Sequence, residues 1–191
     1  MKKRPIAKTL AKYLAALTSV ALCPSLFSAG ALAKDVSLRV GEEAVWVAID
    51  QQLNETHASQ LGLVFNSDDD INIVSGGLFA TGQREQFSGR LGAKVYYADL
   101  DGDNGYGISL GGDLVFAVLP QLDIISGLYF GPSSISFSDV DRYEEWFIKA
   151  RYQMFESGAL TGGYGTLALK PDDGKDVKVD DGFFVEMSLR F

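Results

Sequence analysis

The segment "FFVEMSLRF" (residues 183–191) ends the chain with a strict two-residue alternation. Every second residue is apolar, and these residues are Phe183, Val185, Met187, Leu189 and Phe191. Glu186 and Arg190 occupy polar positions between them. Successive side chains of a β-strand point to opposite faces, so the pattern predicts a strand with one apolar and one charged face.

The same period recurs upstream, in segments separated by turn clusters such as "NSDDD" (66–70) and "FESG" (155–158). This repetition predicts an all-β fold, an antiparallel transmembrane β-barrel. Counting back from the C-terminus gives eight strands, at 58–66, 71–80, 87–99, 106–118, 121–130, 143–154, 158–170 and 181–191.

The stretch "KDVSLRVGEEAVWVAIDQQL" (34–53) is also strand-like. It could form a hairpin that turns at "GEEA" (41–44), which would make ten strands, or it could plug or lean on the barrel.

A periplasmic β-sandwich or a lipocalin-like barrel is the alternative fold, because its strands alternate too. Strand length favours the membrane barrel, since a tilted membrane strand needs about 9–11 residues. The alternation of long acidic loops with short turns favours it as well.

The first 33 residues have the layout of a bacterial secretory signal peptide. Five basic side chains precede an apolar run from Tyr13 to Cys23, and Ala31-Leu32-Ala33 forms a cleavage site. We therefore expect a signal peptide over 1–33 and a barrel domain over 34–191. An uncleaved N-terminal anchor and a lipoprotein modified at Cys23 are the alternatives.

Cleavage makes the chain strongly acidic and removes its single cysteine. The 17 basic side chains less the five of the signal leave twelve against 25 acidic ones, a net charge of −13. Such a chain is a poor partner for nucleic acid, because phosphate repels it. It should attract divalent cations or basic partners instead.

Three segments resemble the YfaZ family of outer-membrane proteins: "GAKVYYADLDGDNGYGISLGG" (92–112), "YFGPSSISFSDVDRYEEW" (129–146) and "DDGFFVEMSLRF" (180–191). The resemblance covers most of the mature chain, in the same order and at similar spacing. It implies an outer-membrane barrel in a Gram-negative bacterium with no assigned molecular role, and it brings no catalytic or binding residues to this sequence.

The alternation also predicts which charged side chains face the lumen: Arg90, Lys94, Asp113, Glu145, Lys149, Arg151, Glu186 and Arg190. Charges inside a narrow barrel need partners, because an unpaired buried charge is strongly disfavoured. Side chains just fill an eight-stranded interior, so we expect an ion-pair network that plugs the barrel. A narrow polar channel for small solutes or ions is the alternative, and it is favoured more if ten strands form.

Thirteen aspartates fall in every second predicted loop. These loops lie at the same end of an antiparallel barrel, so the aspartates should gather at one rim. Asp99, Asp101 and Asp103 imitate the start of an EF-hand loop, but Asn104 and Leu110 stand where its Gly and Glu belong. Turn formation and solvation explain such aspartates without a ligand. A weak Ca²⁺ or Mg²⁺ site near lipopolysaccharide is the sharper hypothesis, because hard cations prefer oxygen ligands.

No enzymatic site is predicted, because the one histidine, His57, has only Glu55, Thr56 and Ser59 near it in sequence. We expect a non-enzymatic role in envelope structure or surface interaction. The expected partners are outer-membrane lipid, lipopolysaccharide and the barrel-assembly machinery. That machinery would read the alternating apolar residues of 183–191 as an assembly signal.

Overall fold

The computed structural model describes residues 34–66, 70–100, 103–138, 140–171 and 176–191. The predicted signal peptide lies outside these residues. The chain forms these elements: β1 (Lys34–Val40), β2 (Ala44–Asn54), β3 (His57–Asn66), β4 (Ile71–Arg84), β5 (Phe87–Leu100), β6 (Asp103–Leu119), β7 (Leu122–Gly131), the 3₁₀ turn η2 (Ser133–Ile135), β8 (Ser136–Ser138), β9 (Val140–Phe155), β10 (Gly158–Pro171) and β11 (Val177–Arg190).

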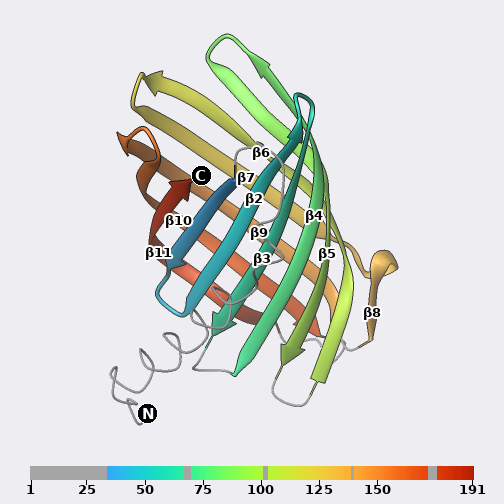
Figure 1. Cartoon of the computed structure of the whole chain (residues 1–191). Coiled ribbons are helices and arrows are strands. Elements are labelled where there is room, and N and C mark those ends of the chain that lie inside the picture. The colour runs from blue at the N-terminus through green and yellow to red at the C-terminus, as the bar shows by residue number, and fades with distance from the viewer. Residues whose placement is uncertain (1–33, 67–69, 101–102, 139, 172–175) are drawn as a thin grey trace. The chain divides into compact units, whose positions relative to one another are not determined.

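Ten of the strands that the structure describes close into a ring, in which each strand is antiparallel to both neighbours (Figure 1). The order β5-β4-β3-β2-β1-β11-β10-β9-β7-β6 returns to β5 through the β5–β6 pairing. The prediction of eight strands is wrong, and the ten-strand alternative is confirmed. The extra pair is the hairpin β1–β2, which turns at residues 41–43 and pairs with both β11 and β3.

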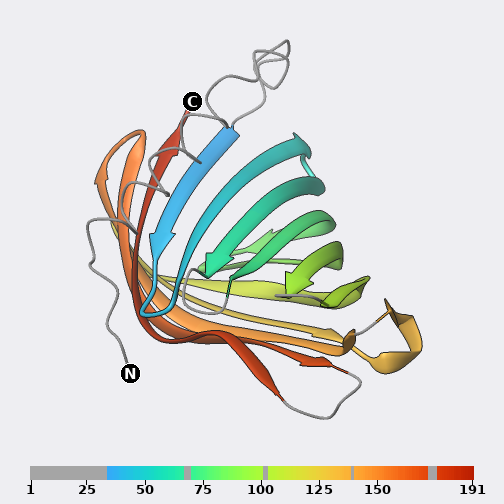
Figure 2. The same cartoon turned by 90° about the horizontal axis from the view of Figure 1, so that it is seen from below.

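The short strand β8 lies outside the ring. It pairs with β6 at residues 105–107, where β7 has already ended. The gold segment that contains β8 projects from the barrel wall in two perpendicular views (Figure 1, Figure 2).

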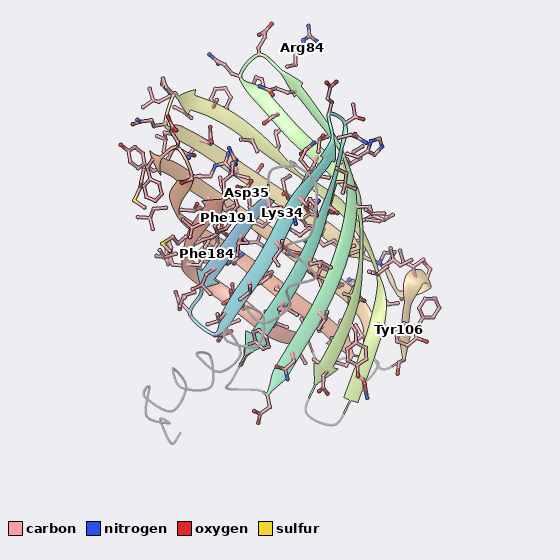
Figure 3. All side chains as sticks on the ribbon, in the orientation of Figure 1. Lys34, Asp35, Arg84, Tyr106, Phe184 and Phe191 are labelled. Carbon is pink, nitrogen blue, oxygen red and sulfur yellow. The ribbon has the colours of Figure 1, made fainter. Side chains whose placement is uncertain are left out.

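The two ends of the barrel differ in their connections. At the end that we name the termini end, the β2–β3, β4–β5, β6–β7 and β9–β10 turns each have two residues. Lys34 and Phe191 lie there side by side and exchange backbone hydrogen bonds of 3.2 and 2.9 Å (Figure 3). The opposite end, named the loop end, holds the longer connections at 67–70, 132–139 and 172–176.

The outer face of the ring is apolar along its strands. Exposed aliphatic and aromatic side chains recur at every second position, among them Leu91, Val95, Ile108, Leu110, Leu128, Ile148, Phe183 and Val185. Exposed apolar residues around a closed sheet indicate contact with lipid, because a sheet exposed to water turns its polar face outward. Within the described residues, no helix is long and apolar enough to cross a membrane.

The inner face of the barrel is mostly apolar towards the loop end, where Asn66 and Asp180 are buried polar exceptions. Leu167, Leu169 and Val179 point inward and are fully buried. Tyr96 of β5 contacts Tyr143 of β9 across the interior, with ring centroids 4.7 Å apart. Together with Val64 and Ile73 of the same buried cluster, these side chains form a layer that we name the apolar floor. The predicted polar plug does not include this layer, because its side chains alternate with Ala168 and Lys178 rather than with a charged series.

Candidate functional site

The interior of the barrel holds a cavity of about 620 Å³. Its lining includes Glu55 in the β2–β3 turn and Gln83 near the end of β4, and both residues are exposed at the termini end. Towards the loop end the lining reaches Val64, Ile73 and Tyr143, which belong to the apolar floor. The cavity therefore opens at the termini end and is closed by the apolar floor.

All eight residues predicted to face the lumen line this cavity. They come from four strands: Arg90 and Lys94 from β5, Asp113 from β6, Glu145, Lys149 and Arg151 from β9, and Glu186 and Arg190 from β11. Each of them forms at least one ion pair.

Lys94 and Glu145 form an ion pair across the interior, just beneath the apolar floor. Lys94 Nζ lies 2.8 Å from Glu145 Oε2, and Tyr143 Oη donates a 2.7 Å hydrogen bond to the same oxygen. The ammonium group also lies 3.4 Å from the centroid of the Tyr129 ring. The two charged side chains are 7% and 6% exposed, so these added contacts offset the loss of water around a buried pair.

Arg90 joins two carboxylates at the middle of the cavity. Its Nε donates to Asp113 at 2.6 Å and its Nη1 to Asp50 at 2.5 Å. Asp50 belongs to β2, which is separated from β5 by two strands, so this contact also spans the interior. Tyr129 Oη donates to the second oxygen of Asp113 at 2.7 Å, and the guanidinium group lies 4.5 Å from the centroid of the Phe79 ring.

Three further pairs lie nearer the termini end, and their exposure increases in that direction. They are Lys149 with Glu186 (2.9 Å), Arg151 with Asp123 (2.7 Å) and Arg190 with Asp35 (2.9 Å). Water screens exposed charges, so the outer pairs contribute less to stability than the buried ones.

Three partners of these residues, Asp35, Asp50 and Asp123, were not predicted, and neither was the buried pair that Arg39 and Asp180 form with each other. Alternation in the 121–130 segment places Asp123 on the inner face. Its pairing with Arg151 could be predicted only with the order of the strands in the ring. Asp35, Arg39 and Asp50 lie in β1 and β2, where alternation in 34–53 was visible but strands were not assigned.

Asp180 was predicted to be a solvated loop residue, and this prediction is wrong. It is 2% exposed and accepts hydrogen bonds from Trp46 Nε1 (3.0 Å) and from Arg39 (3.5 Å). Strand β11 begins at Val177, and its pairing with β10 shifts by one residue beside Leu167. This bulge directs two consecutive residues, Val179 and Asp180, inward, which alternation does not predict.

The proposed cation site falls largely outside the described residues. Asp99 is exposed near the loop end of β5, whereas Asp101 and the side chain of Asp103 lie outside the part of the chain that the structure describes. Among the residues that are described, no group of three acidic, histidine or cysteine side chains is arranged to hold a metal ion.

His57 lies exposed beside a two-residue turn at the termini end. Its Nδ1 lies 2.9 Å from Thr56 Oγ1 and 3.1 Å from Asn54 Oδ1. These neighbours are a hydroxyl and an amide, whereas the imidazole of a catalytic triad is oriented by a carboxylate.

The residues of the predicted assembly signal lie on the outer face of β11. Phe183, Val185, Met187 and Phe191 are exposed, and Leu189 is half-buried. Phe184 points the other way, into the interior, where its ring lies 3.5 Å from the Arg39 guanidinium. The strand therefore carries an apolar stripe along the β1–β11 seam of the ring.

A closed antiparallel ring with an apolar outer face and paired charges inside defines a transmembrane β-barrel. The chain belongs to the YfaZ family: the family profile described as "YfaZ precursor" matches residues 11–191. It is 28% identical over 168 residues to "Outer membrane protein YfaZ" of Escherichia coli (strain K12), which covers 87% of this chain and 93% of that protein. The protein is accordingly an outer-membrane protein.

A solved structure of another outer-membrane protein shares the fold, and a second one has a weaker similarity. A structure titled "Bacterial polysaccharide outer membrane secretin" has a TM-score of 0.51 at 12% identity, over 86% of this chain and 66% of that one. A structure titled "KdgM porin in complex with disordered oligogalacturonate" has a TM-score of 0.49 at 10% identity, over 83% of this chain and 99% of that one. At 12% identity the similarity to the first of these structures shows the fold alone.

Proposed function

We propose that this protein is a non-enzymatic outer-membrane barrel that serves in envelope structure or surface interaction and is closed to flow along its axis. The observation that carries the proposal is the Lys94–Glu145 pair together with the apolar floor. A 2.8 Å contact between strands that are not neighbours obstructs the lumen, and the floor seals the loop-end half.

Conductance of the refolded protein in planar bilayers tests the closure. We expect no stable single-channel openings from the unmodified protein. Lys94→Ala combined with Glu145→Ala removes the crossing contact and the hydrogen bond that Glu145 accepts from Tyr143 of the apolar floor. The double variant should therefore raise the frequency of openings. An outward-facing pair of substitutions, Leu91→Ala with Ile148→Ala, provides the control and should stay silent. Stable, size-dependent channels from the unmodified protein would overturn the closed-barrel proposal.

The surface interaction that we propose uses divalent cations at the loop end. Asp70, Asp99 and Asp176 are exposed there, and hard cations could bridge such carboxylates to lipopolysaccharide phosphates. Calcium should raise the thermal stability of the protein in lipopolysaccharide-containing bilayers. No change in thermal stability across a calcium titration would exclude this contact.

A narrow channel for small solutes is the second candidate, and the cavity of about 620 Å³ favours it. It requires the apolar floor to open, since the cavity reaches only one end. Swelling of protein-containing liposomes in small sugars, compared with larger ones, would detect such opening independently of ion conductance.

A further inference from the structure

We propose that the cavity binds an uncharged, polyhydroxylated small molecule, of the size of a short oligosaccharide, that enters from the termini end. This proposal goes beyond the function proposed above, because a solute occupies the cavity whether or not the barrel conducts. The volume of about 620 Å³ lies within the range of roughly 300–1,000 Å³ that small-molecule sites occupy.

The charged groups of the cavity are already neutralised by one another. Every charged lining residue except Glu55, which is exposed in a turn, forms an ion pair within the described part of the chain. A charged guest would have to break one of these pairs or lose its own hydration without a counter-charge. Both are costly in a partly enclosed space, so the lining selects against ions.

The hydrogen-bonding groups left over are uncharged. Within the described residues, the structure gives no partner to the side chains of Ser37, Ser75, Ser88 and Ser188 or to the amide of Gln51, all of which line the cavity. Hydroxyls donate and accept, and an amide does both through different atoms. A guest rich in hydroxyl groups matches this set, because each of its groups can also do both.

The lining also offers apolar contact next to these polar groups. Trp46, Tyr129 and Phe147 contribute to it. The carbon-bound hydrogens of a sugar ring can pack on such surfaces while its hydroxyls reach the serines. Ser37 and Ser188 are directly paired across the β1–β11 seam, so two free hydroxyls lie together on one wall.

Trp46 provides a direct measurement of occupancy. The chain has two tryptophans, and Trp146 is exposed on the outer face, so Trp146→Phe leaves Trp46 as the sole reporter inside the cavity. The refolded Trp146→Phe protein is titrated with sucrose and maltotriose as uncharged probes. Glucuronate and spermidine serve as anionic and cationic probes at matched ionic strength. We expect a saturable change in Trp46 emission with an uncharged probe and none with the charged ones.

Three variants separate binding in the cavity from other effects. Ser37→Phe fills the cavity and should abolish the saturable change, whereas Ser126→Phe adds the same volume to the exposed outer face and should leave it intact. Ser188→Ala keeps the space and removes one hydroxyl, so it should weaken binding by about fivefold, as expected for one net hydrogen bond. It also keeps the test valid if Ser37→Phe does not fold.

Two results would overturn the proposal. One is saturable binding of glucuronate or spermidine with no binding of sucrose or maltotriose. The other is a response of Trp46 to the sugars that is the same in the Trp146→Phe protein and in its Ser188→Ala derivative. Neither depends on conductance, so the failure of this proposal is distinguishable from the failure of the closed-barrel proposal.

Discussion

Lys94 and Glu145 form an ion pair across the barrel although their strands, β5 and β9, are separated by β6 and β7 in the ring. Tyr143 and Tyr129 contact the same two charges from β9 and β7. The pair therefore connects two parts of the barrel wall that are not neighbours, where the polar cavity meets the apolar floor. Its removal should affect both stability and permeability.

Lys94→Met should destabilise the protein by about 3–5 kcal/mol, because it leaves the Glu145 carboxylate buried without its counter-charge. Unfolding by urea in lipid vesicles measures the change in the free energy of unfolding. Arg142→Met is the matched control, because Arg142 and Glu144 form an exposed pair. That change should fall within about 1 kcal/mol. An equal decrease in the free energy of unfolding of the two variants would contradict the importance of burial.

Much of the barrel follows from the sequence. Strands predicted at 87–99, 158–170 and 143–154 are observed at 87–100, 158–171 and 140–155. The two-residue period of the side chains predicts these strands, because lipid outside the barrel and charged groups inside it impose a strict alternation. The inward position of Arg90, Lys94 and Glu145 follows from the same parity.

What the sequence did not reveal depends on contacts between distant strands. Strand β1 has only seven residues, and its place in the ring is set by its pairing with β11, which no local pattern encodes. The apolar floor combines Leu167, Val179 and Tyr143 from three strands, and each is locally indistinguishable from a lipid-facing residue. The bulge turns both Val179 and Asp180 inward, and no local sequence pattern predicts it.

Closure of the ring by β1 and β11 predicts a specific cross-link. Ser37 and Ser188 are directly opposite each other in the seam, and opposite Cα atoms of an antiparallel pair lie about 4.5–5.5 Å apart, within disulfide range. Ser37→Cys with Ser188→Cys, in a Cys23→Ser background, should form an intramolecular disulfide on mild oxidation. A shift in gel mobility that thiol reverses would detect it.

The control pairs Ser37→Cys with Ser126→Cys, which lies on the outer face of β7, far from β1 in the ring order. This variant should remain uncross-linked. A ring of eight strands that excludes β1 would predict no cross-link in either variant. The absence of a disulfide between residues 37 and 188 would therefore contradict the ten-strand closure.

The exposed apolar face predicts a depth-dependent cost of charge. Leu91 is 73% exposed near the middle of β5, so Leu91→Arg should destabilise the barrel by about 2–4 kcal/mol in a bilayer. Val118→Arg, near the termini end of β6, should cost about 0–1 kcal/mol. Equilibrium unfolding from lipid vesicles compares the two variants. A soluble barrel with this face in water would show little difference between them.

Lys34, where β1 begins, and Phe191 lie at the end with the two-residue turns, and this arrangement predicts the orientation in the membrane. Short turns face the periplasm in outer-membrane barrels, and long loops face outward. Asp70→Cys and Asp176→Cys, in a Cys23→Ser background, should therefore react in intact cells with a thiol reagent that does not cross the membrane. Glu85→Cys and Ser157→Cys, in two-residue turns, should react only after the outer membrane is permeabilised. The reverse labelling pattern would place the mouth of the cavity at the cell surface and reverse the direction from which its solute arrives.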